Sequence, residues 1–229
     1  MKPSRWIDIS SPEDDSFNLF SCDVLNSDKT LTGYYFTKQF TDVHASQICQ
    51  SLLERDTRKR QVWDTNCKMM NQLELHPKLS LDIVESVTAY PKPLASRKYR
   101  YISKWKAFKL QDASYYCIFS ISEKFDKKRQ VGAKSEASSN GSSWGGYFKQ
   151  IVKTSVDIVQ DTPTDVDFSY SFTVIKQNTK DPKICTVSCI YTEDTNSVIP
   201  SSMRKSILAY SVPNYLSNLQ KYALKYKKF

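Results

Sequence analysis

The feature that most constrains this fold is a series of segments with alternating apolar and polar residues, followed by one long stretch with helical spacing. Alternation with a period of two places one set of side chains on each face of a β-strand. Because these segments follow one another without long helices between them, they predict an antiparallel sheet in an α+β fold. The alternating segments lie around residues 17–24, 34–40, 81–90, 99–105, 115–121, 166–174 and 183–191.

Helical spacing occurs in few places. Ile48, Leu52 and Arg55 would share one face of a first helix, and a second helix is expected around residues 67–73. The C-terminal stretch predicts the longest helix, with a kink at Pro213, because proline removes a backbone donor. One face of this helix carries an apolar stripe formed by Leu216, Leu219, Tyr222, Ala223 and Tyr226.

The size and composition of the chain narrow the classes of function. A length of 229 residues allows a full core, and no break in composition marks a boundary, so we expect a single domain over residues 1–229. Only 5 glycines are present, which argues against dinucleotide-binding and P-loop folds. Aromatic residues make up 13% of the chain, as in β-structure or around an apolar cavity. The net charge of +9 favours an anionic partner, either nucleic acid or a membrane surface.

Several patterns suggest a reducing compartment. The 6 cysteines show no zinc-site spacing, and Cys185 and Cys189 are too far apart along a strand to share a bridge. We therefore expect reduced thiols. The N-terminal residues show no apolar signal segment, and no apolar run approaches the roughly 18 residues that a membrane span needs. The expected location is the cytoplasm, with peripheral membrane contact.

The sequence offers little for catalysis. The segment GSSWG contains Ser143 in the spacing of a hydrolase nucleophile, but a Ser-rich loop precedes it and no histidine follows it. His44 and His76 have no acidic or cysteine neighbours at metal-ligand spacing. No pair of carboxylates stands out for acid–base chemistry. We therefore predict a protein that is not an enzyme and that holds no metal or cofactor.

Two binding functions remain open at this point. In residues 98–109, KYRYISKWKAFK, lysines and arginine alternate with Tyr, Trp and Phe, and such a strand could stack bases and pair phosphates of single-stranded nucleic acid. Alternatively, a curved sheet closed by the C-terminal helix could enclose a lipid. Burial of each methylene contributes about 0.8 kcal/mol, so a lipid with two acyl chains needs an apolar tunnel. A phosphate inside it would need a paired cation.

Four motifs in the same order resemble the START family, the lipid-transfer domains related to the steroidogenic acute regulatory protein. These motifs are a strand, a helix and a Trp-Asp element, then a Tyr-Pro segment, an Asp-rich turn ending in Ile-Pro, and the C-terminal helix. They correspond here to TGYYFTKQF with RKRQVWD, then YPKPLASRKY, YTEDTNSVIP and VPNYLSNLQKYALKYKK. The resemblance is closest to the phosphatidylcholine transfer branch. It implies a helix-grip fold, in which a curved antiparallel sheet surrounds a lipid cavity that a long C-terminal helix closes.

The resemblance also implies a headgroup site. Arg60 stands where that branch has the arginine that reaches the lipid phosphate, and Asp64 would orient it. Tyr99 and Tyr191 match two tyrosines of the aromatic cage that holds the choline ammonium by cation–π attraction. Ser86 replaces a tryptophan of that cage, which leaves room for a smaller or different headgroup, a sterol or another lipid. We expect Arg60→Ala to lower phospholipid transfer and to spare folding.

The C-terminal helix is expected to be the gate of the cavity. Leu216, Leu219 and Tyr222 would form its apolar face, and Lys221 and Lys225 would attract anionic lipid. The function that follows is a monomeric carrier that binds one phosphatidylcholine-like phospholipid, touches anionic membranes transiently and exchanges its ligand between them. Nucleic acid is not the expected partner.

Overall fold

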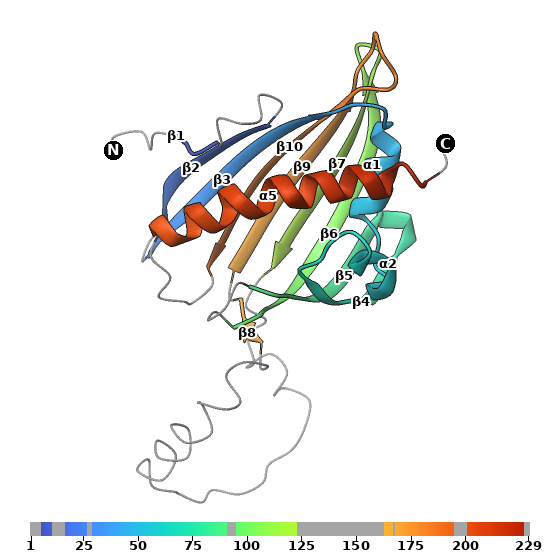
Figure 1. The fold of residues 1–229 in the computed structure, drawn as a ribbon. Coiled ribbons are helices and arrows are strands. Elements are labelled where there is room, and N and C mark those ends of the chain that lie inside the picture. Colours follow the sequence, from blue (N-terminus) through green and yellow to red (C-terminus); the bar gives the residue numbers. More distant parts are fainter. Residues whose placement is uncertain are drawn as a thin grey trace, which may run out of the picture.

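One curved sheet and one long helix across its open side dominate the computed structural model, which describes residues 6–10, 17–26, 29–90, 95–122, 163–166, 168–194 and 201–226 (Figure 1). The sheet has 10 strands in the order β1-β2-β3-β10-β9-β7-β6-β5-β4, and β8 pairs with β6. The elements are β1 (Ile7–Asp8), β2 (Phe17–Asn26), β3 (Lys29–Phe40), α1 (Ala45–Leu52), α2 (Thr57–Gln61), β4 (Cys67–His76), η1 (Pro77–Leu79), β5 (Leu81–Thr88), β6 (Arg97–Leu110), β7 (Ala113–Ser122), β8 (Thr164–Asp165), β9 (Phe168–Gln177), β10 (Cys185–Asp194) and α5 (Ser201–Ala223).

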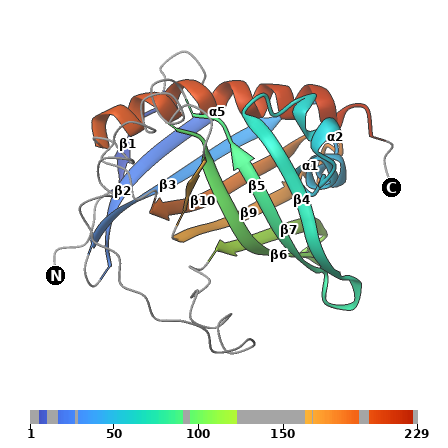
Figure 2. The same ribbon diagram turned by 90° about the horizontal axis from the view of Figure 1, so that it is seen from below.

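The predicted fold class is confirmed. Each pair of neighbours along the main path of the sheet is antiparallel, and only the short β8 runs parallel to its partner β6. Seen from below, the strands curl beneath α5, with β4 and β5 toward one end of the sheet and β2 and β3 toward the other (Figure 2). The concave side of the sheet therefore faces α5 and encloses the interior.

The main core lies between this concave face and the helices. The apolar stripe of α5 contributes Leu216 and Leu219, which are fully buried. They share one cluster with residues of the first and middle strands and of α1. The alternation in β3 is confirmed, because Tyr34, Phe36 and Phe40 are all buried. Burial of each such side chain contributes roughly 1.5–3 kcal/mol, so this shared face holds α5 against the sheet.

The orientation of the middle strands differs from a simple apolar-inside pattern. In β7 and β9 the more aromatic face lies on the convex side, where Phe119 and Phe172 stand opposite each other. The concave face presents Ile118, Ser120 and Thr173, which line an internal cavity. The alternation was therefore predicted correctly, but on these strands the interior receives mostly the small hydroxyl side chains.

The alternating segment predicted at residues 81–90 forms the strand β5. Leu81 and Ile83 are only half-buried, whereas Asp82, Val84 and Ser86 are buried. Asp82 is held inside by an ion pair described below. The inward face of β5 therefore carries a buried carboxylate together with Val84, and Val87 of the other set is buried as well.

Two helix predictions also need correction. Residues 67–73 belong to the edge strand β4, which pairs with β5 through two register shifts, so sheet pairing overrides local helical spacing. The first helix exists as α1 but ends at Leu52, and Arg55 lies beyond it. In α5, the helical assignment runs through Pro213 without interruption. Pro213 lacks the backbone N–H that a helix residue normally donates, but the helix continues on both sides of it.

The turn between β6 and β7 offers a test of backbone strain. Gln111 and Asp112 have φ of 48° and 65°, a left-handed pair that glycine and asparagine adopt more easily than glutamine does. We expect Gln111→Asn with Asp112→Gly to raise the free energy of unfolding by about 1 kcal/mol. Thermal and urea unfolding would measure it. A Gln111→Val variant should lower stability instead, and equal stability of all three proteins would contradict the strain.

Candidate functional site

Two hollows lie beneath α5, one on each side of Tyr215. The inner cavity has a volume of about 300 Å³ and is bounded by β3, β6, β7, β9, β10 and α5. The outer cleft has a volume of about 340 Å³ and lies between α5, the residues before β4 and the end of β5. Tyr215 lines both hollows, so the two spaces meet at this residue.

The inner cavity combines aromatic, aliphatic and hydroxyl side chains. Phe36, Val187 and Ile118 form apolar wall, and Leu216 and Leu219 of α5 close it. The sheet supplies a second group of small polar side chains, namely Ser103, Ser120, Ser169, Ser171 and Thr173. A cavity of this kind suits an amphiphile, because apolar walls favour alkyl groups while scattered hydroxyls can bind polar atoms.

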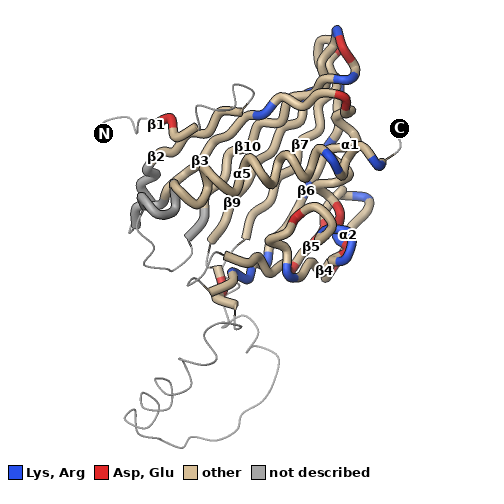
Figure 3. The backbone as a smooth tube through the Cα atoms, viewed as in Figure 1, with Lys and Arg blue, Asp and Glu red and all other residues tan. Residues whose placement is uncertain are grey.

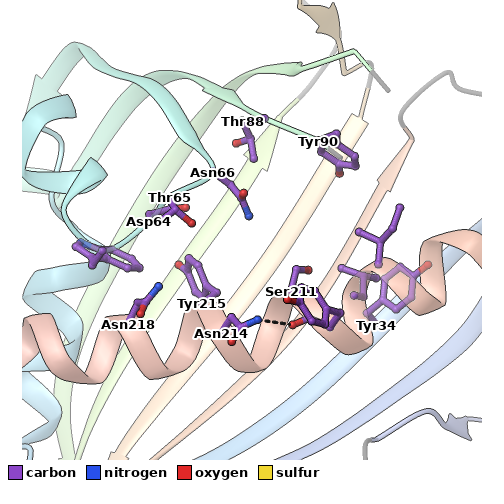
Figure 4. Close-up of a pocket in the computed structure, with 15 residues that line it drawn as sticks. Tyr34, Asp64, Thr65, Asn66, Thr88, Tyr90, Ser211, Asn214, Tyr215 and Asn218 are labelled. Atoms are coloured by element: carbon purple, nitrogen blue, oxygen red, sulfur yellow. Dashed lines mark hydrogen bonds between the residues drawn. The ribbon is translucent and has the colours of Figure 1, made fainter. Parts of the chain in front are cut away.

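The outer cleft is more polar. Figure 4 shows Asn66 and Thr88, from the residues around β4 and β5, on the side of the cleft opposite Asn214 and Asn218 of α5. Asn214 donates its side-chain N–H to the carbonyl oxygen of Tyr210 at 3.2 Å. The cleft therefore presents amides and hydroxyls at the edge of the helix, where a ligand with a polar end could pass between α5 and the sheet.

The partition between the two hollows is built around Arg60 of α2. Its Nε donates to Asp64 Oδ2 at 3.0 Å, Nη1 to the carbonyl of Leu52 at 3.1 Å, and Nη2 to the hydroxyl of Tyr215 at 3.2 Å. The guanidinium also lies 4.2 Å from the ring centroid of Trp63. Arg60 thus ties α1, α2 and α5 together, and it is buried.

The electrostatics of the partition keep Arg60 charged. Burial acts to lower the pKa of Arg60, but Tyr215 and Asp64 outweigh it, and the pKa is raised. Burial also raises the pKa of Tyr215, so its hydroxyl stays protonated. Three of the five N–H groups of Arg60 have the partners named above. Any anion in the inner cavity would therefore share this cation with Asp64.

A second buried ion pair lies at another wall of the inner cavity and was missed in the sequence. From the sequence, Arg55 is expected on a solvated face near the membrane together with Arg58 and Lys59. For Arg55 this is wrong, since its side chain is only 13% exposed and lines the cavity. Its Nε donates to Asp82 Oδ2 at 2.7 Å, and Nη2 donates to the hydroxyl of Ser103 at 3.0 Å. The sequence signal that could have revealed this pair is Asp82 on the inward face of β5. Alternation does not show which face of a strand points inward, so this signal could not be recognised.

The structure brings together three of the five residues predicted for the headgroup. Arg60, Tyr99 and Tyr191 all line the inner cavity. The hydroxyl of Tyr99 lies 3.4 Å from that of Tyr90, and the ring of Tyr191 stacks on Tyr34 with centroids 5.1 Å apart.

The other two residues occupy different places. Asp64 lines the outer cleft rather than the inner cavity. Ser86 is buried beside Tyr99 in the sheet.

The predicted gate residues separate into two groups. Leu216 and Leu219 face the inner cavity, so they belong to the inner side of α5. Tyr222 stacks on Trp63 with centroids 6.1 Å apart. Lys221 and Lys225 are exposed. The expected apolar face of α5 is therefore directed into the molecule, and only the lysines are placed to touch an external surface.

Two of the three residues considered for catalysis, His44 and His76, have contacts within the fold that do not form a catalytic group. Ser143 lies outside the described residues. His44 caps α1 by accepting from the backbone N–H of Ser46 at 3.2 Å, and His76 is 3.4 Å from Glu74 on an exposed strand. Within the described ranges, no group of three or more His, Cys, Asp or Glu could hold a metal, and no helix there is long and apolar enough to cross a membrane.

The six cysteines, all in described segments, form no disulfide. Burial raises the pKa of Cys185 to about 12 and that of Cys189 to about 11. Burial, and to a lesser degree Cys117, raises the pKa of Cys49 to about 12. These thiols remain protonated at neutral pH and behave as small apolar groups of the core.

The fold is shared with lipid-transfer domains of known structure. Human STARD10 has 16% identity and a TM-score of 0.60, over 96% of this chain and 74% of that chain. Human StAR-related lipid transfer protein 5 has 12% identity and a TM-score of 0.61, over 95% and 86%. The human StarD13 lipid transfer and protein localization domain has 13% identity and a TM-score of 0.58, over 98% and 89%.

These likenesses establish the helix-grip fold expected from the sequence motifs. No family model matches the sequence, and no curated protein matches it. The shared property is therefore the arrangement of a curved sheet around an interior that a C-terminal helix covers.

Proposed function

We propose that this chain is a lipid carrier that encloses one phospholipid, of phosphatidylcholine type, and exchanges it between membranes. The observation that carries the proposal is the pair of hollows that meet at Tyr215 beneath α5, one with an apolar wall and one with a polar rim. The helix-grip fold shared with lipid-transfer domains supports it. An unfilled cavity does not stabilise the fold, so the two hollows favour a role in binding a ligand.

The headgroup is assigned to the inner cavity. Arg60 and Arg55 are the cations of its lining, and each is held by a carboxylate. Arg60 has N–H groups beyond the three with named partners, so it can bind a phosphate oxygen while keeping Asp64. Tyr99 and Tyr191 line the same space and can attract an ammonium through their ring faces. This assignment retains the phosphate role inferred for Arg60 from the family motif.

The size of the hollows implies that α5 moves when a lipid is bound. Two acyl chains contain roughly thirty methylenes, and if each takes about the volume of one water molecule in the liquid, about 30 Å³, they need roughly 900 Å³. The inner cavity and the outer cleft, at about 300 and 340 Å³, can hold them only if they join and widen. Displacement of Tyr215 would join them. A single-chain lipid or a sterol would fit with a smaller movement.

Transfer between vesicles tests the proposal. A donor vesicle with a labelled phospholipid and an unlabelled acceptor should exchange label faster when the protein is present. Ser171→Trp, which fills the inner cavity, should reduce the transfer rate at least tenfold, since overpacking removes the space for the ligand. The matched control is Phe172→Trp, because the neighbouring side chain lies on the convex face.

Native mass spectrometry of protein purified from cells gives a second measurement. A bound mass in the wild type that is lost in Ser171→Trp and kept in Phe172→Trp would identify the ligand class. Absence of transfer for every phospholipid and sterol offered would refute a carrier function. Equal transfer by both variants would remove the inner cavity from the site.

A further inference from the structure

The basic and aromatic stretch of β6 does not contribute as a whole to the cavity. Its first half lines the interior through Tyr99, Tyr101 and Ser103. Its second half, from Lys104 to Leu110, is exposed at every residue. This half extends beyond the last pair of β5 with β6, which joins Leu81 to Lys104, and it continues through the turn into β7. We call residues 104–115 the distal hairpin.

The distal hairpin exposes large apolar side chains that the fold does not cover. Trp105 is 39% exposed, Phe108 41% and Leu110 56%. Leu79 of η1, which is 58% exposed, lies close by, because the backbone N–H of Trp105 donates to the carbonyl of Ser80 at 3.0 Å. Successive side chains of a strand point to opposite faces, so Trp105 lies on one face of the hairpin and Phe108 and Leu110 lie on the other. The projecting hairpin therefore exposes apolar side chains on both faces, which is unusual for a surface that binds nothing.

Cations are interleaved with these apolar residues. Lys104, Lys106 and Lys109 are exposed on the same strand, and Asp112 is the acid within the hairpin. Figure 3 shows basic and acidic residues together on this projecting end of the sheet, which the turn between β9 and β10 shares (Figure 1), whereas the middle of α5 is tan. The outward positions Asn214 and Ser217 of α5 are polar. The C-terminal end of α5 also exposes Leu224, just after its last residue, beside Lys221 and Lys225, and Tyr210 is 78% exposed, so α5 is the competing surface. The hairpin combines more large apolar side chains with three lysines in one short segment.

We propose that the distal hairpin is the surface by which this protein docks on anionic membranes. Trp105, Leu110 and Leu79 would enter the interfacial region of the bilayer, and the three lysines would contact anionic headgroups. The proposal rests on the proposed function only in that a lipid carrier must reach a membrane. It assigns to β6 the membrane contact that the sequence suggested for α5.

The chemistry of the hairpin favours a bilayer over nucleic acid. The ring of Phe108 is stacked on Tyr115, with centroids 5.4 Å apart and an angle of 10° between the planes, so one face is already covered. Leu110 and Leu79 are aliphatic and have no ring on which a base could stack. Burial of aliphatic side chains among acyl chains, in contrast, is favourable. Oligonucleotide binding is therefore one of the outcomes that the test must separate.

Vesicle sedimentation with the full chain tests the docking surface. The vesicles contain phosphatidylcholine alone, or with about one third phosphatidylserine. Replacement of Lys104, Lys106 and Lys109 by Gln should weaken binding to the anionic vesicles by roughly a hundredfold, at about fivefold for each lysine. Trp105→Ser with Leu110→Ser should weaken binding to both kinds of vesicle. Melting temperatures should stay unchanged, since all five side chains are exposed.

Control variants separate the possible results. Lys221→Gln with Lys225→Gln removes charge from α5 and should lower vesicle binding far less. A larger loss in this pair than in the hairpin variants would overturn the proposal in favour of α5. Unchanged vesicle binding in both hairpin variants would also overturn it. The hairpin would be assigned to nucleic acid if its variants bind vesicles normally and the wild type binds a single-stranded oligonucleotide in a salt-sensitive way that the lysine variant loses.

Failure of the lipid-carrier function gives a different pattern. A wild-type protein that sediments with anionic vesicles through the hairpin, but transfers no lipid, would refute the carrier and leave the docking surface in place. If the wild-type protein transfers lipid and the hairpin variants bind vesicles normally, the docking surface is refuted and the carrier function stands. Hairpin variants should keep any ligand seen by native mass spectrometry, because none of the substituted residues lines either hollow.

Discussion

Arg60→Ala is expected to lower the free energy of unfolding by about 3 kcal/mol, in addition to any effect on lipid transfer. The substitution leaves Asp64, whose side chain is 13% exposed, without its cation. It also removes the donors to the carbonyl of Leu52 and the hydroxyl of Tyr215. Chemical denaturation measures the change. The expectation from sequence alone, that folding would be spared, does not fit a residue that joins three helices.

Two variants separate the ion pair from other effects at this position. Arg58→Ala removes an exposed arginine from the same helix and should change stability by less than about 0.5 kcal/mol. Arg60→Ala combined with Asp64→Ala should be less destabilising than the sum of the single changes, because no buried charge is left alone. Full stability of Arg60→Ala would show that the partition is not held by this guanidinium. Transfer by Arg60→Ala must be measured where the variant is folded.

Asp82→Ala is expected to destabilise the protein by a similar amount, about 3 kcal/mol, because it leaves Arg55 in the wall of the inner cavity without its carboxylate. Asp82 accepts from Arg55 at 2.7 Å and from the side-chain amide of Gln72 at 3.3 Å. These contacts join the residues after α1 to β4 and β5. Loss of the acid should also increase the affinity of the cavity for anions, since the charge of Arg55 is then unbalanced.

The control lies on the same strand. Glu85 pairs with Lys98 at 2.9 Å on the more exposed face of the sheet. Glu85→Ala should therefore cost less than about 1 kcal/mol. If Asp82→Ala and Glu85→Ala lower the free energy of unfolding equally in urea, the inward position of Asp82 does not increase its contribution to stability. Arg55→Ala combined with Asp82→Ala should be more stable than Asp82→Ala alone, because no charge is then left without its partner.

The phase of the strands could not be predicted from alternation. A period of two establishes that side chains occupy two faces, but both faces of β7 and β9 carry residues that tolerate an interior. Phe119 and Phe172 are the more apolar choice, yet they lie on the convex side. The face that is covered depends on where α1 and α5 pack, and these helices are distant in the chain. The same reason applies to β5, where alternation alone did not show that Asp82, Val84 and Ser86 take the inward face.

Local spacing and residue order alone predicted an antiparallel sheet followed by a long C-terminal helix, because most of the strands and α5 carry their own periodicity. The curvature of the sheet around a cavity was implied by the family resemblance. The motif around Trp63 also led to Arg60 as an inward cation, by family likeness. Tertiary structure alone decided that Arg55 turns inward as well, that residues 67–76 form an edge strand and that Tyr215 divides the interior. The physical reason is that an ion pair such as Arg55 with Asp82, or the pairing of β4 with β5, joins partners whose match no local pattern encodes.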